Sequence, residues 1–271
     1  MNKNITAWER VKLARDPKRP TANFIINQLF DDFIELKGDR LYGDDESIIG
    51  GIGTINKIPV TIIAEEKGVN TEDKIKRNFG MPHPEGYRKS LRLMKQAEKF
   101  KRPIITFIDT PGAYPGIEAE ERGQARAIAH NIKEMMKLKT IVIVVVLSEG
   151  GSGGALAIGV GDYIYMFENS IYSILSPEGF ATILYKDSTK AKEAAQHMKL
   201  TSYDLLNFNI IDQVILEKEG LHINPDYGIN NLKKELTKQI RKLSKVPLDD
   251  LLSNRYKKYR NIGIFEENKN E

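Results

Sequence analysis

Cysteine is absent from this chain of 271 residues, and histidine occurs only four times. Without cysteine the chain can form neither a disulfide, nor a thiolate nucleophile, nor a thiolate zinc site. The histidines are not spaced like metal ligands, so we expect no metal in this chain; they are His83, His130, His197 and His222. No apolar run approaches the roughly 18 residues that a membrane span requires, and no signal-peptide pattern follows Met1. We therefore expect a soluble, cytoplasmic protein with no membrane partner.

The charge of the chain is close to balanced, with 41 Lys and Arg against 37 Asp and Glu. A net charge of +4 is too mild to predict binding to nucleic acid or a membrane surface. Basic residues cluster within 10–19 and 255–260, where they form either solvated faces or partner contacts. The length predicts one large α/β domain with extensions, which we divide into an N-terminal helical segment (1–40), a core (41–220) and C-terminal helices (221–271).

Hydrophobic periodicity predicts alternating strands and helices. Thr21 is expected to cap a helix whose apolar positions continue to Leu36, before Gly38 ends it. Two strands joined at Asn56-Lys57 predict a hairpin over residues 48–64. Further strands are expected at 104–108, 141–146, 163–167, 171–175 and 213–216. Further helices are expected at 84–100, 117–138, 180–197, 201–208, 232–243 and 248–259, and irregular backbone at 71–83.

One segment indicates chemistry most directly. The β-branched run 141–146 is followed by four glycines within five residues and then by an apolar run; the glycines are Gly150, Gly151, Gly153 and Gly154. This order predicts a strand, a tight turn and a helix whose first N–H groups lie beside backbone that other groups can approach closely. Such a turn forms a backbone site for negative charge.

Spacing limits what this turn can bind. A P-loop requires Gly-Lys-Ser/Thr, whereas Ala155-Leu156 follow Gly154, and the third glycine of a dinucleotide fingerprint would fall on Leu156. Neither nucleotide site is therefore expected. Residues 150–154 do match the G-x-S-x-G nucleophile elbow, which keeps Ser152 open as a nucleophile. A turn that only lets a helix pack close to a sheet also remains open.

A second strand is followed by a glycine turn of the same kind. Residues 104–108 end in Asp109-Thr110-Pro111-Gly112-Ala113-Tyr114-Pro115-Gly116, and a helix follows. Because parallel strands present their carboxyl ends at one edge of a sheet, we expect the two turns to lie side by side. Ligands of α/β proteins bind at that edge.

Five motifs occur in order along the chain, and together they carry a resemblance. They are Gly50-Gly51-Ile52-Gly53; Arg77-Asn78-Phe79-Gly80 with Pro84-Glu85-Gly86-Tyr87-Arg88-Lys89; Asp109 to Gly116 with Glu120-Glu121-Arg122-Gly123-Gln124; Glu149 to Gly159; and Ser176-Pro177-Glu178-Gly179. In this order they resemble the α subunits of the carboxyltransferase component of bacterial acetyl-CoA carboxylase. The resemblance covers roughly residues 31–217. Longer members of that family carry a further N-terminal helical segment, which this chain is not expected to have.

The resemblance implies a crotonase-like (ClpP/crotonase) α/β fold of repeated ββα units, flanked by N- and C-terminal helices. It also implies that carboxybiotin on a biotin carboxyl carrier protein gives its carboxyl group to acetyl-CoA, which forms malonyl-CoA for fatty acid biosynthesis. The family assigns the backbone N–H groups that map to Gly153 and Gly154 to the biotin oxyanion, with Ala155 beside them. Gly112 and Ala113 would line the same cleft.

The resemblance further implies partners for the chain. These are a carboxyltransferase β subunit, which carries a four-cysteine zinc ribbon and the oxyanion site for acetyl-CoA, together with the carrier protein and biotin carboxylase. An α2β2 assembly is expected. Arg88 and Lys89 begin a helix beside the expected cleft, where they are candidates to contact the phosphates of CoA or the β subunit.

Two other classes of function remain open from the sequence. One is a stand-alone enzyme, either a crotonase-type acyl-CoA hydratase or decarboxylase, or a serine hydrolase that pairs Ser152 with His222 and with Asp187 or Asp212. The other is a scaffold subunit without a catalytic role. For Glu149 and Ser152 themselves, capping of a turn or helix start is the favoured interpretation.

Overall fold

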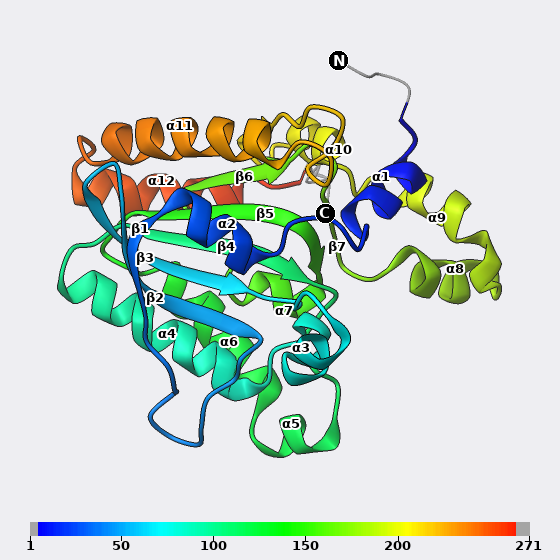
Figure 1. Ribbon diagram of the computed structural model, residues 1–271, viewed down its shortest axis with the longest axis horizontal. Coiled ribbons are helices and arrows are strands. Elements are labelled where there is room, and N and C mark those ends of the chain that lie inside the picture. The colour runs from blue at the N-terminus through cyan, green and yellow to red at the C-terminus, as the bar shows by residue number, and fades with distance from the viewer. Residues whose placement is uncertain (1–4, 264–271) are drawn as a thin grey trace, which may run out of the picture.

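An eight-stranded sheet runs through the computed structural model, which describes residues 5–263 (Figure 1). Seven strands follow the order β1-β2-β3-β4-β5-β6-β8, and β7 pairs with β5. The pairs β1·β2 and β2·β3 are antiparallel, whereas every pair from β3 onward is parallel. The bounds are β1 Asp31–Glu35, β2 Ile48–Ile55, β3 Ile58–Glu65, β4 Ile104–Thr110, β5 Val142–Gly151, β6 Tyr163–Phe167, β7 Ile171–Ser173 and β8 Gln213–Ile215.

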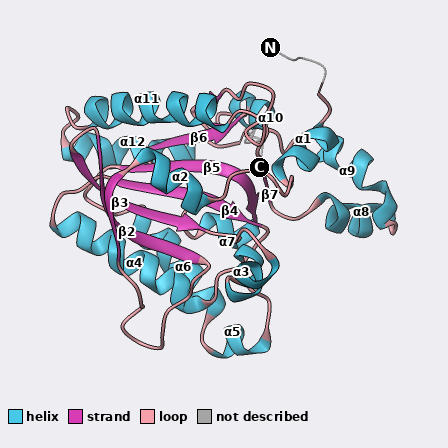
Figure 2. Ribbon diagram, viewed as in Figure 1, coloured by secondary structure: helices cyan, strands magenta, loops and turns pink. Residues whose placement is uncertain are grey.

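Helices cover both faces of this sheet (Figure 2). They are α1 Ala7–Ala14, α2 Ala22–Leu29, α3 Thr71–Lys76, α4 Pro84–Lys99, α5 Ile117–Glu121, α6 Gln124–Met135, α7 Ser152–Leu156, α8 Pro177–Tyr185, α9 Ala191–Met198, α10 Ser202–Asn207, α11 Pro225–Leu243 and α12 Leu248–Arg260, with 3-10 turns η1 Asn78–Gly80 and η2 Ser188–Lys190. Apolar residues of α2 and α11 pack on one face, and those of α4, α6 and α7 pack on the other.

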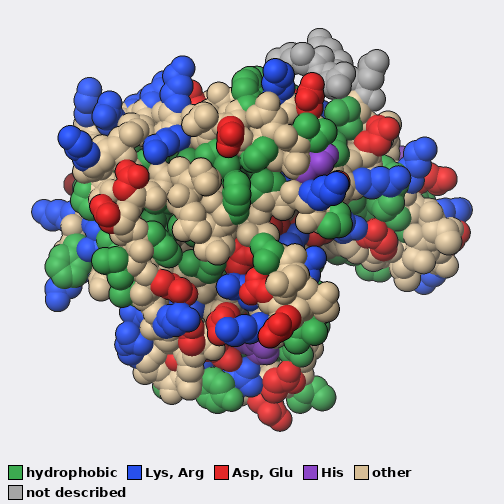
Figure 3. Space-filling view, viewed as in Figure 1, with side chains coloured by type: hydrophobic (Ala, Val, Ile, Leu, Met, Phe, Trp, Pro, Cys, Tyr) green, Lys and Arg blue, Asp and Glu red, His purple; other side chains and the backbone are tan. Residues whose placement is uncertain are grey.

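The central strands have the composition that two covered faces require. Every residue of β4 and β5 is buried, and their apolar runs do not alternate with polar residues. Hydrophobic side chains therefore point into both helical layers. At one end of the sheet a smaller apolar cluster joins α1, α9 and β7 through Val11, Ile171 and Ala195. Together with α8, these helices project from the body at the right of the space-filling view (Figure 3).

Most of the predicted elements are confirmed. The hairpin β2–β3, the strands β4 and β6, and the helix α4 lie within one or two residues of their expected bounds, whereas β5 begins as expected but continues past Val146 to Gly151. The fold is the expected α/β arrangement of a largely parallel sheet with covering helices. The division of the chain at residues 40 and 220 stays a prediction, and the end of the expected C-terminal segment, 264–271, lies outside the described residues.

Several predicted elements differ from the structure in their extent: η2 divides the helix expected over 180–197 into α8 and α9, and the helix expected over 232–243 begins at Pro225. The helix expected to continue to Leu36 ends at Leu29, and β1 follows, because Asp31, Ile34 and Glu35 pair with β2. The helix expected over 117–138 is split into α5 and α6 by Gly123, whose φ of +84° interrupts helical geometry. Residues 71–83 are not wholly irregular, since α3 forms there with Asn70 as its N-cap.

Candidate active site

The two glycine turns meet at the carboxyl ends of adjacent parallel strands, as expected. Thr110 of β4 lies opposite Gly150 of β5. A Cβ atom on Gly154 would come within 2.6 Å of the Ala113 nitrogen, and one on Gly151 would overlap the Pro111 carbonyl. Glycine is required at both positions because the backbones of the two turns touch.

Helix α7 begins at this contact. Its N-cap is Gly151, and no side chain within residues 5–263 caps its first N–H groups, which include those of Gly153 and Gly154. The first N–H groups of any α-helix have no intrahelical acceptor, so they are free to donate to an anion. A Cβ on Gly153 would meet nothing closer than Ile128 at 3.6 Å. The two donors predicted for the biotin oxyanion therefore lie together, while Ala155 is buried one residue further along the helix.

The loop after β4 is held in one conformation by its own hydrogen bonds. The Thr110 hydroxyl accepts from the Gly112 N–H at 3.0 Å and donates to the Gly112 carbonyl at 2.7 Å. The Tyr114 ring stacks on His83 at 4.2 Å, and the Tyr114 N–H donates to the Pro82 carbonyl. Gly112 and Ala113 thus lie against α7, and their role in lining a ligand cleft stays a prediction.

A group of charged residues lies beneath both turns, and the sequence did not indicate it. The Lys67 ammonium is 2.8 Å from a carboxylate oxygen of Asp109 and 3.2 Å from one of Glu149. Burial by itself lowers the pKa of Lys67, but the two carboxylates outweigh it and raise that pKa. Burial would raise the pKa of Glu149, yet Lys67 and Arg15 hold it below its ordinary value. Both shifts favour the charged forms of Lys67 and Glu149.

A neighbouring carboxyl group behaves differently. Glu65, at the end of β3, is fully buried, and burial raises its pKa well above the ordinary value. One of its oxygens accepts the N–H of Asp109 at 3.1 Å, and the other has no hydrogen-bond partner among the described residues. Burial thus favours the neutral form of Glu65, whereas the nearby cations favour the charged form of Glu149.

The structure places Arg88 and Lys89 away from the glycine turns. Lys89 is buried, and its ammonium donates to Asp44 at 2.6 Å and to the Asp45 carbonyl at 2.8 Å. Arg88 donates to Asp39 at 2.7 Å. Because both side chains hold the segment before β2 against α4, we leave them out of the site proposed below.

The residues of the alternative serine hydrolase are not brought together. No hydrogen bond within residues 5–263 joins Ser152 to a histidine, and one ring nitrogen of His222 is buried without a partner. Asp187 accepts from Thr189, and Asp212 pairs with Lys258. Ser152 itself has left-handed backbone at φ +52°. Across the described chain, no three His, Asp or Glu residues are grouped to hold a metal ion.

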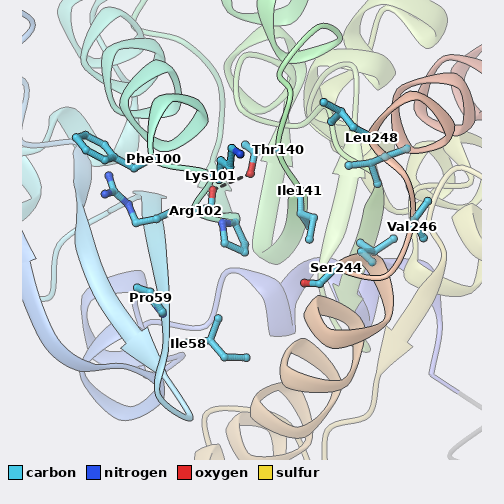
Figure 4. A pocket seen from close by; sticks show the side chains of 13 residues that line it. Ile58, Pro59, Phe100, Lys101, Arg102, Thr140, Ile141, Ser244, Val246 and Leu248 are labelled. Atoms are coloured by element: carbon cyan, nitrogen blue, oxygen red, sulfur yellow. Dashed lines mark hydrogen bonds between the residues drawn. The ribbon is translucent and has the colours of Figure 1, made fainter.

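A hollow of about 430 Å³ lies at the opposite edge of the sheet (Figure 4). Ile58, Pro103 and Ile141 line it beside the amino ends of β3, β4 and β5, and residues of the α11–α12 connection close its other side. Its position separates it from the glycine turns, which follow the carboxyl ends of the same strands. None of the glycines of the two turns lines this hollow. None of the described helices is both long and apolar enough to cross a membrane.

Comparison with known proteins decides the family. The model of the acetyl-CoA carboxylase carboxyltransferase-like family matches residues 1–263. The acetyl-coenzyme A carboxylase carboxyl transferase subunit alpha of Clostridium perfringens is 60% identical over 257 residues, which cover 94% of this chain and 95% of the relative. The chain belongs to this carboxyltransferase family. A relative with the same description from Alkaliphilus oremlandii is 56% identical and covers 98% of this chain and 84% of its own length.

A solved structure supports the fold of the family at much lower identity. Transcarboxylase 12S, with methylmalonyl-coenzyme A bound, covers 100% of this chain with a TM-score of 0.67 and 17% identity. The chain spans about half of the transcarboxylase polypeptide, 49% of its length. The crotonase-like carboxyltransferase fold is thereby confirmed. The family and its named relatives favour a biotin-dependent carboxyltransferase over the hydratase and hydrolase alternatives.

Proposed function

We propose that this chain is the α subunit of the carboxyltransferase of acetyl-CoA carboxylase. It transfers the carboxyl group of carboxybiotin, held on a biotin carboxyl carrier protein, to acetyl-CoA, and the product malonyl-CoA enters fatty acid biosynthesis in the cytoplasm. The observation that carries the proposal is the uncapped start of α7, set at the contact of two glycine turns in a chain 60% identical to a named α subunit.

The donor set at α7 fits the biotin ureido group. When bound, carboxybiotin would supply the activated carboxyl group and a ureido oxygen that accepts hydrogen bonds. The N–H groups of Gly153 and Gly154 donate to this oxygen, and fixed donors aimed at a developing charge are a large source of catalysis. Ala155 continues the same helix, and Gly112 with Ala113 forms the facing wall.

A β subunit is the proposed partner, and it supplies the oxyanion site for the thioester of acetyl-CoA as well as the zinc ribbon. Apolar side chains are exposed on the segments that surround the glycine turns, which favours a protein partner there. They are Val69 at 67%, Phe79 at 52%, Ile117 at 78%, Leu156 at 42% and Ile174 at 68% exposed. An α2β2 enzyme that also works with the carrier protein and biotin carboxylase completes the proposal.

The proposal is tested by separating the subunits. We expect the isolated chain to show negligible malonyl-CoA decarboxylation with biocytin as the carboxyl acceptor, because one of the two oxyanion sites is missing. The β subunit alone should be equally inactive, and mixing the two should create activity. Appreciable turnover by the isolated chain would contradict the two-subunit enzyme. A mixed complex that assembles but remains inactive would contradict carboxyl transfer.

A further inference from the structure

Lys67 joins the first residues of the two glycine turns. It follows β3, whereas Asp109 lies near the end of β4 and Glu149 near the end of β5. The side chains of these carboxylates are only 5% and 11% exposed, and that of Lys67 is 22% exposed. One ammonium therefore lies between two largely buried carboxylates that approach it from adjacent strands.

Both carboxylates belong to residues from which the turns begin. Asp109 also accepts the backbone N–H of Glu149 at 3.2 Å, so it links the two strand ends directly. From Asp109 the chain passes through Thr110 and Pro111 to Gly112, and from Glu149 it passes through two glycines to the start of α7. The separation of Asp109 and Glu149 therefore sets how the facing wall lies on the donors of α7.

A second cation extends the group to the projecting helices. Arg15, the C-cap of α1, donates to Glu149 at 2.7 and 2.9 Å and to Glu178 of α8 at 2.9 Å. Its side chain is 30% exposed, so its contribution is screened more than that of Lys67. Lys67 is the only residue among these that contacts the carboxylates of both strand ends.

We propose that Lys67 is a positioning residue for carboxyl transfer: it bridges Asp109 and Glu149 and so fixes the Gly112–Ala113 wall against the donors of Gly153 and Gly154. This inference rests on the function proposed above. Without the ammonium, two carboxylates that share one buried site repel each other, and the strand ends separate. A displacement of about 1 Å at reacting groups costs on the order of 10²-fold in rate.

The test measures kcat and KM for malonyl-CoA in the α–β complex with biocytin as acceptor. We expect Lys67→Met to lower kcat by about 10²-fold while the KM for malonyl-CoA stays within about threefold, since the thioester is held by the β subunit. Lys67→Arg retains a cation that can reach both carboxylates and should recover most of the lost rate. Lys76→Met is the matched control, because Lys76 is 61% exposed and pairs with Glu46 away from the turns.

The double variant Lys67→Met/Glu149→Gln separates positioning from charge burial. The double variant removes one positive and one negative charge, so the net charge of Lys67, Asp109 and Glu149 together is that of the wild type. No ammonium joins residues 109 and 149, however, so the complex should assemble and kcat should remain low. If the double variant recovers kcat to within about threefold of the wild type, Lys67 serves only to balance buried charge and the proposal is overturned. A Lys67→Met complex that keeps full kcat overturns it equally.

The activity of the wild-type complex separates the proposed carboxyl transfer from the positioning role of Lys67. A wild-type complex without activity removes the proposed function, and the positioning role with it. If the wild-type complex is active, and Lys67→Met and Lys67→Met/Glu149→Gln both retain its kcat, only the role of Lys67 is removed. If Lys67→Met does not assemble, the charge-balanced double variant decides the question by the same kcat criterion.

Discussion

The most informative substitution in the proposed site is Gly153→Ala, because the structure separates its effect on folding from its effect on a ligand. A Cβ at residue 153 meets only Ile128, at 3.6 Å, which is ordinary van der Waals contact. Gly153 lies inside α7, where alanine is favoured over glycine by roughly 0.5–1 kcal/mol. The variant should therefore be as stable as the wild type or slightly more stable.

The same methyl group should impair carboxyl transfer. It adds bulk beside the N–H donors and keeps the ureido ring from its closest approach. A displacement of about 1 Å corresponds to a loss on the order of 10²-fold in kcat, and removal of one oxyanion donor altogether costs on the order of 10²–10³. We expect kcat for biocytin-dependent decarboxylation to fall within this range and the KM for malonyl-CoA to change little.

Two further glycine variants calibrate this result. Gly154→Ala places its Cβ 2.6 Å from the Ala113 nitrogen, so backbone must shift, and both stability and activity should fall. Gly43→Ala is the matched control, because a Cβ there meets nothing within 4 Å, and it should leave both unchanged. Chemical denaturation, complex formation and steady-state kinetics are measured on all three. Near-full kcat in an assembled Gly153→Ala complex would refute the assignment of Gly153 to the biotin oxyanion.

Three other substitutions test separate parts of the structure. Glu65→Gln should stabilise the isolated chain at neutral pH. The pKa of Glu65 is higher in the folded than in the unfolded state, so the free energy of unfolding of the wild type is greatest below the unfolded pKa and falls as pH rises, by up to about 1.4 kcal/mol per pH unit. Glutamine does not titrate and so avoids this loss. The Tm advantage of this variant should grow from about pH 5 to about pH 8, and a constant difference would contradict a protonated Glu65. Ser152→Ala should change kcat by less than about threefold, whereas a loss of several orders of magnitude would restore the nucleophile alternative. Arg255→Met should cost about 3–5 kcal/mol in urea unfolding, because buried Arg255 pairs with Asp162 and donates to three backbone carbonyls; an unchanged midpoint would refute its role in anchoring α12.

The parts of the fold that the sequence predicted are those determined locally. A window of about ten residues is enough to recognise the buried runs of β4 and β5 and the turn of the β2–β3 hairpin. β1 was missed because its neighbours share helical spacing, and only pairing with β2, some twenty residues away, selects extended backbone. The break at Gly123 was missed because an isolated glycine in a periodic segment is often tolerated.

The same distinction applies to the site. Glycine turns are visible in sequence because glycine itself is the signal, so Gly112, Gly153 and Gly154 could be named before their contact was known. Lys67 carries no such signal: it lies 42 residues from Asp109 and 82 from Glu149, since 109 − 67 = 42 and 149 − 67 = 82. A single lysine after a strand is ordinarily a solvated side chain, and only the parallel register of β3, β4 and β5 brings it between two carboxylates. Donors that the backbone supplies can thus be predicted from local pattern, whereas the side chains that hold those donors in place follow from the order of strands in the sheet.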